Sequence, residues 1–502
     1  MNVAHSFRLL TASTIVLIGS GVIGAAAGNA GAASAANRVP LLWASETTEG
    51  YEIATAVAVG DDRIATVGDH FSQTCVAGVG CGIDAALRVH DARTGALQWV
   101  VNFDLNRTFD TNQAVAIANR TVITAGYSLN NIRTFGHDWW VVSAFALDTG
   151  ALLWRDVVGD ALTDYFPWQI VVNDGRAYVT GLAGPTCATV DSTTCDQFVR
   201  VYDIATGAVV WSLREDPSNG GDDETLSIAV AGRVMVIGGS IGAGTDPSID
   251  PTVPEVRAYD VRTRQLLWED VMPDSSLHGF VFKVAADEDR VVAAAVASDD
   301  WLVRAYDART GRILWSKTFS RTGTSVPGIY DGPVQLALNE GTVVVGGYGS
   351  TQVFGTEMYP KASRDWAVRA YNAETGKLLW SDISGSPTDV DEVDGGVVIA
   401  GGHAYALGFV SDANGDTHTL VRAYQLRTGR IDWEDMVDRP GFPFGVTITL
   451  AAGANRLAAA SYVHGTRPAG TPPPASFGYD LLLRTYRIGG DDGTDNGQDN
   501  TR

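Results

Sequence analysis

The sequence contains few basic residues, and lysine is the rarest of them. Its 502 residues include 36 Lys and Arg against 58 Asp and Glu, a formal net charge of −22, and only four of the basic residues are lysine. Nucleic acids are bound through basic patches that neutralise their phosphates, so this composition excludes a nucleic-acid partner. A strongly acidic balance instead favours a soluble protein that works outside the cytoplasm.

Cysteine is equally scarce. The four cysteines form two close pairs in the sequence, Cys75 with Cys81 and Cys187 with Cys195, and neither pair has the Cys-x-x-Cys spacing of a metal site. In an exported protein such pairs form disulfides. We therefore predict the disulfides Cys75–Cys81 and Cys187–Cys195, each closing a short loop, rather than metal ligation.

Long apolar runs are absent after the first 35 residues. Arg8 is followed by an apolar stretch, 9–27, and Ala33-Ser34-Ala35 fits a cleavage site, so residues 1–35 are predicted to be a signal peptide. The alternative, an uncleaved membrane anchor, needs about 20 more strongly apolar residues. We therefore expect a secreted or periplasmic protein with no membrane span in the mature chain.

The motifs of common reactions are also missing. The sequence has no Ser-His-Asp order, no glycine-rich phosphate loop and no His-Glu-x-x-His. This absence favours a non-catalytic protein and leaves an enzyme as the alternative.

What the chain has instead is one phrase repeated seven times. The phrase is an aromatic residue, an acidic or polar residue, two variable residues, Thr-Gly, three variable residues and Trp. The copies end at Trp99, Trp154, Trp211, Trp268, Trp315, Trp380 and Trp433, in steps of 47 to 65 residues. A period of this size with strand-like flanks indicates a repeat architecture.

Each copy of the phrase predicts a β-hairpin. The Asp-x-x-Thr-Gly segment forms its turn, because the Asp accepts backbone N–H groups and the Gly adopts positive φ. Two further apolar runs precede every hairpin, as in 56–70 with its turn at Gly60–Asp62. Each unit therefore has four antiparallel strands, A to D, as in a propeller blade. The Trp on strand D is expected to fill the space between blades, with its indole N–H bonded to a nearby acceptor.

The two chain ends complete the ring. The segment around Trp43 looks like a strand D without a strand C, and residues 480–488 look like a strand C without a strand D. Pairing them closes the sheet edge. The prediction is an all-β, eight-bladed β-propeller over residues 36–490, whose last blade is closed by the N- and C-terminal strands. Residues 491–502 are expected to be a disordered acidic tail.

The repeated phrase resembles that of the PQQ-like, quinoprotein-type family of bacterial propellers, over essentially all of the mature chain. The family includes pyrroloquinoline-quinone (PQQ) alcohol dehydrogenases, an outer-membrane assembly lipoprotein, and many exported propellers without assigned chemistry. The dehydrogenases carry adjacent cysteines, and a calcium held by Glu and Asn beside a catalytic Asp. This chain has no adjacent cysteines, and no Cys stands at the predicted mature N-terminus. PQQ is therefore implied only under the alternative function.

Function is expected on one face of the ring. In a propeller the D–A and B–C loops share one face, here called the loop face, and the A–B and C–D turns share the other, the turn face. The C–D turns are uniform, so the turn face is expected to be structural and the loop face functional. Both cysteine pairs fall in B–C loops, those of the first and third blades.

Two D–A loops of the loop face are rich in carboxylates. These are Glu215, Asp216, Asp222, Asp223 and Glu224 in one loop, and Asp389, Asp391, Glu392 and Asp394 in the other. Such groups can bind calcium, raise one another's pKa, attract a basic partner, or form a solvated rim. Asp389 and Asp391 are predicted ligand-face residues.

A B–C loop offers a candidate calcium site. Asp412, Asn414 and Asp416 place oxygen atoms at alternate residues, which can converge on one calcium ion. The bidentate Glu of an EF-hand is not in place, so a polar hairpin tip is the alternative.

Histidines and tyrosines supply the remaining predicted ligand-face residues. His70 and His403 are expected at the same position near the end of strand B, matched by Tyr127 and Tyr348 in other blades, with His464 one residue further on. Zinc would need these side chains within a few ångströms of one ion. Polar pocket residues or plain loop packing are the expected roles.

The sequence therefore predicts an exported, monomeric, non-catalytic propeller that binds a protein, glycan or small molecule through its loop face. The alternative is a PQQ- and calcium-dependent alcohol or sugar dehydrogenase.

Overall fold

The computed structural model describes most of the chain between residues 39 and 488. The described residues are 39–47, 52–76, 80–105, 109–129, 137–160, 162–185, 187, 195–242, 252–272, 279–321, 331–356, 359–385, 390–412, 416–437, 448–453, 455–464 and 479–488. The predicted signal peptide and acidic tail lie outside them. No described segment is an α-helix, and thus none is a helix able to cross a membrane.

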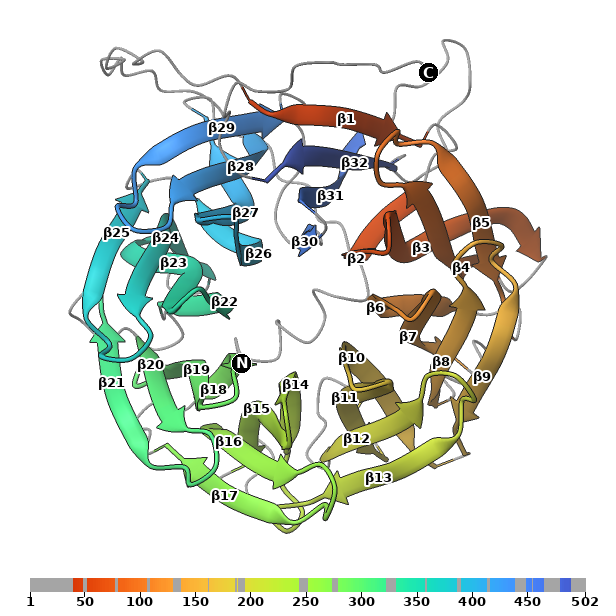
Figure 1. The fold of residues 1–502 in the computed structure, drawn as a ribbon, viewed down its shortest axis with the longest axis horizontal. Helices are drawn as coiled ribbons and strands as arrows, with labels where there is room; N and C mark the ends of the chain where they lie inside the picture. The colour runs from red at the N-terminus through yellow and green to blue at the C-terminus, as the bar shows by residue number, and fades with distance from the viewer. Residues whose placement is uncertain are drawn as a thin grey trace, which may run out of the picture.

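Eight four-stranded antiparallel sheets surround a central opening, each running from strand A at the centre to strand D at the rim (Figure 1). The first four are β2–β5 (Glu52–Gly60, Arg63–Val76, Gly80–Asp91, Leu97–Phe103), β6–β9 (Asp110–Ala118, Thr121–Leu129, Asp138–Ala146, Leu152–Val158), β10–β13 (Asp164–Asn173, Arg176–Gly184, Asp196–Asp203, Val209–Glu215) and β14–β17 (Glu224–Ala231, Val234–Gly242, Thr252–Asp260, Leu266–Val271).

The next three are β18–β21 (Phe280–Ala286, Arg290–Ala297, Asp300–Asp307, Ile313–Phe319), β22–β25 (Gly332–Asn339, Thr342–Thr356, Tyr359–Asn372, Leu378–Ser384) and β26–β29 (Glu392–Ala400, His403–Ser411, Thr417–Gln425, Ile431–Val437). These seven sheets are blades 1 to 7 of the ring.

Blade 8 joins the two ends of the chain, as predicted. Its strands β30 (Thr449–Gly453), β31 (Arg456–His464) and β32 (Tyr479–Arg487) are completed by β1 (Leu41–Glu46). In this ladder Trp43 pairs with Thr485. The eight-bladed propeller with terminal-strand closure is confirmed.

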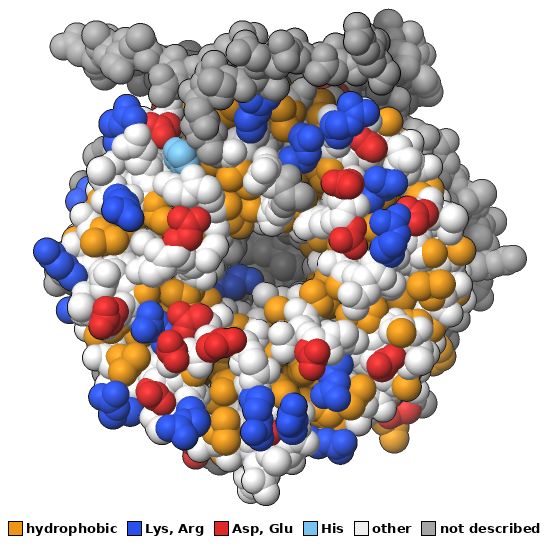
Figure 2. All heavy atoms as spheres, viewed as in Figure 1, with side chains coloured by type: hydrophobic (Ala, Val, Ile, Leu, Met, Phe, Trp, Pro, Cys, Tyr) orange, Lys and Arg blue, Asp and Glu red, His pale blue; other side chains and the backbone are white. Residues whose placement is uncertain are grey.

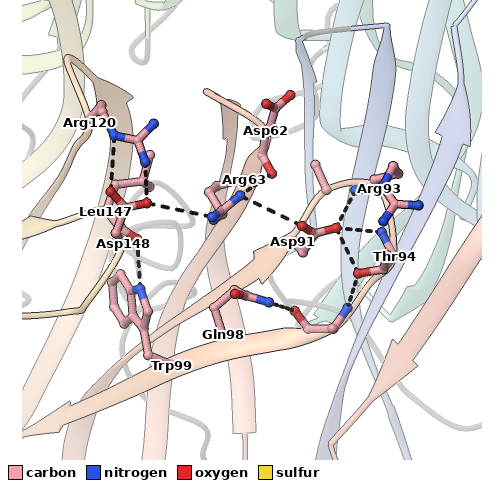
Figure 3. A network of polar contacts seen from close by, with 12 residues as sticks. Asp62, Arg63, Asp91, Arg93, Thr94, Gln98, Trp99, Arg120, Leu147 and Asp148 are labelled. Carbon is pink, nitrogen blue, oxygen red and sulfur yellow. Dashed lines mark hydrogen bonds and ion pairs between the residues drawn. The ribbon is translucent and has the colours of Figure 1, made fainter. Parts of the chain in front are cut away.

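The repeated Trp joins neighbouring blades. Its ring packs on the turn glycine of the following blade, and its Nε1 donates to a carbonyl there, as for Trp99 and Leu147 at 2.8 Å (Figure 3). Five further tryptophans make the same bond: Trp43 to Ala92, Trp154 to Ile204, Trp268 to Ala308, Trp315 to Ala373 and Trp380 to Leu426. The predicted packing of the Trp between blades is confirmed at these junctions.

A second set of side chains ties the blades together near the rim. Between blades 4 and 5, Asp270 accepts hydrogen bonds from Arg304 and Tyr306, each at 2.8 Å. Asp156, Asp382 and Asp435 accept from the corresponding Arg and Tyr at three other junctions. Because these groups are partly buried, a substitution that removes one partner would leave the charge or hydrogen-bonding group of the other buried without its partner, which costs stability.

Candidate functional site on the loop face

Aspartates recur where strand A begins, on the loop face of the ring. They are Asp110, Asp164, Asp223, Asp331 and Asp391, and all five are buried. They stand at the first residue of strand A or directly before it. At this position a carboxylate can reach both the D–A loop before it and the end of the neighbouring strand B.

Hydrogen bonds show that two of these aspartates join the D–A loop to the end of strand B. Asp331 accepts the backbone N–H of Arg321 in the D–A loop and that of Ser350 in strand B, both at 2.6 Å. Asp223 likewise accepts the N–H of Ser218 and of Gly242, both at 3.1 Å.

Asp391 extends the pattern to blade 7, where its Oδ1 accepts the N–H of Ser411 at 2.8 Å. Four of the nine predicted acidic loop residues, Asp222, Asp223, Asp391 and Glu392, are buried. A solvated rim is therefore the wrong description for these four. Asp223 joins its D–A loop to strand B, and Asp391 bonds the end of strand B.

Burial changes the protonation of the bracing carboxyls. It raises the pKa of Asp110, Asp223 and Asp331 to about 6, because the charged form loses its water. For Asp223 and Asp331 the backbone N–H bonds act in the opposite direction but do not outweigh the desolvation. In blade 7, burial and the charge of Glu392 raise the pKa of Asp394 well above its ordinary value.

Blades 1 to 3 contribute a cluster of titratable groups at the end of strand B. Burial raises the pKa of Asp69 to about 7, against a hydrogen bond from Thr111 that lowers it. Burial and the charge of Asp164 raise the pKa of Asp138 to about 7. The pKa of Tyr127 is raised mainly by burial and further by the charges of Asp138 and Asp69. Two carboxyls here can exchange protons near neutral pH.

The predicted ligand-face residue His70 lies beside this cluster. Its Nδ1 is 3.2 Å from Oε1 of the buried Glu52, which also pairs with Arg88. His70 is therefore part of an ion-pair network at the entry of strand A in blade 1. Asp69, and not His70, takes the position that corresponds to Tyr127, since Asp69 follows Gly68 as Tyr127 follows Gly126 in the paired strands.

The predicted equivalence of His403 with His70 is wrong. His403 begins strand β27 on the turn face, where its Nε2 is 2.7 Å from Asp432. Gly401 and Gly402 form the A–B turn, so His403 begins strand B, whereas His70 lies near the loop-face end of strand B. His464 ends β31 on the loop face, and its side chain is outside the described residues. The predicted grouping of three histidines is therefore not formed.

Tyr348 does stand where Tyr127 does, as expected. It follows Gly347, is buried, and carries the guanidinium of Arg364 above its ring at 4.1 Å. Arg364 also pairs with Glu392. Asp389 lies outside the described residues.

The Asp412–Asp416 loop is held as a turn. Oδ1 of Asp412 accepts the N–H of Asp416 at 2.9 Å, and the carbonyl of Asp416 accepts the N–H of Asp412 at 2.8 Å. These bonds fit the polar hairpin tip, while Asn414 lies outside the described residues, and calcium binding stays a prediction. No three His, Cys, Asp or Glu side chains among the described residues are grouped to hold a metal ion.

The cysteines follow the sequence prediction in part. Cys187 and Cys195 form a disulfide in the B–C loop of blade 3, with their Cα atoms 5.4 Å apart. Cys75 and Cys81 lie within strands β3 and β4, where the ladder sets them directly opposite each other, and not in the loop between them. The Cys75–Cys81 bond stays a prediction because these side chains are outside the described residues.

Several site residues escaped the sequence argument. Asp69, Asp110, Asp138 and Asp331 were not singled out, although an Asp recurs where strand A begins. Aligning the blades on that entry Asp, in addition to the Trp, would have revealed Asp110 and Asp331. Asp69 and Asp138 had no such signal, because Asp69 approaches Tyr127 only through the packing of blade 1 on blade 2, and Asp138 approaches it through the pairing of β7 with β8.

The sequence pattern of one protein family, described as "Outer membrane protein assembly factor BamB" and built on PQQ-like repeats, matches residues 84–248 and 254–442. A comparison with curated protein sequences gave no match. Among solved structures, a europium-containing methanol dehydrogenase superimposes with a TM-score of 0.55 at 15% identity, covering 89% of this chain and 93% of that chain.

Two further solved structures have the same architecture. The quinohemoprotein alcohol dehydrogenase from Comamonas testosteroni has a TM-score of 0.54 at 14% identity, covering 89% of this chain and 76% of that chain. The Dos1 propeller has a TM-score of 0.51 at 11% identity, covering 90% and 98%. At such low identity these similarities establish the fold alone.

Proposed function

This chain belongs to the PQQ-like repeat family of β-propellers, and from that premise we propose that it is an exported, non-catalytic propeller that binds a protein partner through its loop face. The charge of −22, the signal-peptide pattern and the Cys187–Cys195 disulfide support a place outside the cytoplasm.

The observation that carries the proposal is the length of two B–C hairpins. In blade 1, β3 and β4 have 14 and 12 residues, and in blade 6, β23 and β24 have 15 and 14. Strands B and C of the other blades have only 8 or 9 residues. The extra length extends both hairpins beyond the blades on the loop face, where a partner strand could pair with their edges.

The base of these hairpins supports rigid recognition. The buried aspartates brace the D–A and B–C loops, and the disulfide closes a further loop in blade 3. Loops held in one conformation lose less entropy when a partner binds. Asp331 therefore holds the base of the blade 6 hairpin, and Glu52, in contact with His70 and Arg88, lies at the base of the blade 1 hairpin.

Shortening the hairpins tests the proposal. Replacing residues 352–362 by Asn-Gly keeps the pairing of Ser350 with Arg364 and removes the tip of blade 6. Replacing 73–81 by Asn-Gly does the same in blade 1 beyond Phe71 and Ile83. The expected result is that a partner captured by the full mature chain from the extracytoplasmic fraction is lost, with an unchanged melting temperature.

A matched control comes from the turn face, where Arg309→Ala should retain the partner. If both shortened variants capture the partner as well as the full chain does, the loop-face hairpins are not the binding surface.

The second candidate is a PQQ-dependent alcohol or sugar dehydrogenase. Two carboxyls with pKa values of about 7, Asp69 and Asp138, favour it, since a base near neutrality suits proton abstraction. The fit to the cofactor is poor: the sequence lacks adjacent cysteines, and the described residues offer no grouped metal ligands. We therefore derive no quinone-dependent step.

Titration of the purified chain with PQQ and calcium, followed by absorbance, separates the two candidates. We expect no saturable binding at micromolar quinone. Saturable uptake together with alcohol-dependent dye reduction would replace the non-catalytic proposal by the dehydrogenase.

A further inference from the structure

One junction of the ring departs from the Trp docking that six others share. At six junctions the strand-D Trp packs on a turn glycine whose φ lies between 65° and 76°, at Gly95, Gly150, Gly207, Gly311, Gly376 and Gly429. A Cβ at any of these glycines would lie 2.5–2.8 Å from the Trp ring. Docking therefore requires glycine.

Between blades 3 and 4 this glycine is replaced by Arg264. The fourth copy of the repeat reads Asp260-Val-Arg-Thr-Arg264, and Arg264 keeps the left-handed backbone with φ 63°. A side chain now occupies the space into which Trp211 would dock. Trp211 is only 6% exposed, yet its Nε1 has no hydrogen-bond partner in the described structure. The expected acceptor, the Val261 carbonyl, is not engaged.

A cavity of about 360 Å³ takes the place of the missing contact. It is lined by Arg176, Val210, Trp211, Val261, Arg262 and Arg264. Three arginines, two valines and the Trp211 side chain, whose buried Nε1 has no hydrogen-bond partner in the described structure, thus line one space. Figure 2 shows basic side chains gathered on this part of the rim, near β13 and β17. The volume is in the lower range of small-molecule sites.

The positive charge of the cavity is largely uncompensated. Asp260, the nearest carboxylate in sequence, accepts the N–H groups of Arg262 and Thr263 at 2.9 Å and pairs with Arg233 at 2.6 Å. Within the described part of the chain, neither Arg264 nor Arg262 forms an ion pair. The Arg264 guanidinium donates to the carbonyl of Val210, at 3.4 Å, while its backbone N–H donates to the carbonyl of Asp260.

The third arginine is partly engaged. Arg176 forms no direct ion pair with a described residue, but it hydrogen-bonds the Tyr178 side chain, and its charge contributes weakly, after the hydrogen bonds from Thr206, to the lowered pKa of Asp203. Three arginines therefore line one cavity in a protein whose net charge is −22.

We propose that this cavity binds the phosphate end of a small phosphomonoester. Guanidinium groups bind such dianions through paired N–H bonds, and three of them converge here. The Nε1 of Trp211 donates to a phosphate oxygen in place of the lost carbonyl. Val210, Val261 and the indole face contact the organic part of the ligand. This site is on the turn face and is independent of the proposed loop-face function.

Tryptophan indole N–H resonances test the proposal directly. In the 15N-labelled mature chain, Trp211→Phe identifies the Trp211 signal. Phenyl phosphate should shift that signal saturably, and inorganic phosphate should shift it with weaker affinity. Benzoate, a monoanion, should bind at least about tenfold more weakly than phenyl phosphate.

Two outcomes overturn the proposal. One is that the Trp211 signal shows no saturable shift up to about 10 mM phenyl phosphate, because the dissociation constant would then be too high for a specific site. The other is benzoate binding as tightly as phenyl phosphate.

Substitutions locate the site. Arg264→Gly restores the repeat, so we expect the Trp211 indole to bond Val261, the melting temperature to rise, and phenyl phosphate affinity to fall at least about tenfold. Arg262→Ala should also weaken binding. Arg309→Ala is the matched control, since Arg309 holds the same turn position in blade 5, where Gly311 is retained. Unchanged binding in Arg264→Gly, or equal losses in Arg262→Ala and Arg309→Ala, would contradict the proposed site.

Discussion

The aspartates of the two faces of the ring differ in burial. Those on the turn face are half-buried, namely Asp91, Asp203 and Asp307, whereas those on the loop face are buried, namely Asp110, Asp223 and Asp331. On the turn face, hydrogen bonds from the Thr three residues later lower the pKa of each Asp. On the loop face, burial raises it to about 6. The same side chain thus closes a local turn on one face and braces distant loops on the other.

The turn-face network shows how local the first arrangement is. Asp91 accepts the N–H groups of Arg93 and Thr94 and the hydroxyl of Thr94, all within one turn (Figure 3). Arg63 lies between Asp91 and Asp148, at 3.9 and 3.7 Å. Surface pairs of this kind contribute little stability.

The largest expected effect is on the loop face. Asp331→Ala leaves the N–H groups of Arg321 and Ser350 without their acceptor in a buried place, so the free energy of unfolding should fall by about 2–4 kcal/mol. Denaturant titration measures it. Asp331→Asn keeps one oxygen and should lose less. A loss below about 1 kcal/mol for Asp331→Ala would remove the bracing role.

The disulfide of blade 3 should have the next largest effect. Replacing Cys187 and Cys195 by Ala opens a short closed loop and should cost about 2–3 kcal/mol against the unfolded chain. The carbonyl of Cys195 also accepts the N–H of Asp223 at 2.7 Å, so protease cleavage should increase first on the loop face.

Peptide mapping without reduction tests both cysteine pairs. It should recover Cys187 linked to Cys195 and Cys75 linked to Cys81. Free thiols in protein from its native compartment would contradict both the pairing and the predicted export.

The smallest expected effect is on the turn face. Asp307→Ala removes hydrogen bonds to the N–H and hydroxyl of Thr310 at the surface, where water replaces them. We expect a loss of about 0.5–1.5 kcal/mol by denaturant titration. A loss equal to that of Asp331→Ala would show that the two faces do not differ as described.

The repeat made most of the fold predictable, because Trp, Gly and Asp at fixed spacing each have one structural use. Trp99, Gly150 and the turn at Asp91 are examples. The site was harder to predict. His403 was expected near the end of a strand B but begins one, and the closeness of Asp69 to Tyr127 depends on how two blades pack. Arg264 was visible in the sequence, but its consequence for Trp211 required the structure.

The dependence of stability on pH tests the difference between the faces most directly. In the folded protein the pKa of Asp223 and Asp331 is above the ordinary value of 3.8. Their contribution to the free energy of unfolding is therefore complete below pH 3.8 and is lost as pH rises through about 6. Asp91 and Asp307 have lowered pKa values, so their contribution is lost only as pH falls below the ordinary range.

The free energy of unfolding should therefore be measured by denaturant titration between about pH 5 and about pH 8. We expect it to fall across this range in the parent chain, to fall less steeply in the double variant Asp223→Asn/Asp331→Asn, and to keep the parent slope in Asp91→Asn/Asp307→Asn. Stability that rises with pH in this range, or equal slopes in the parent and the loop-face variant, would contradict the account.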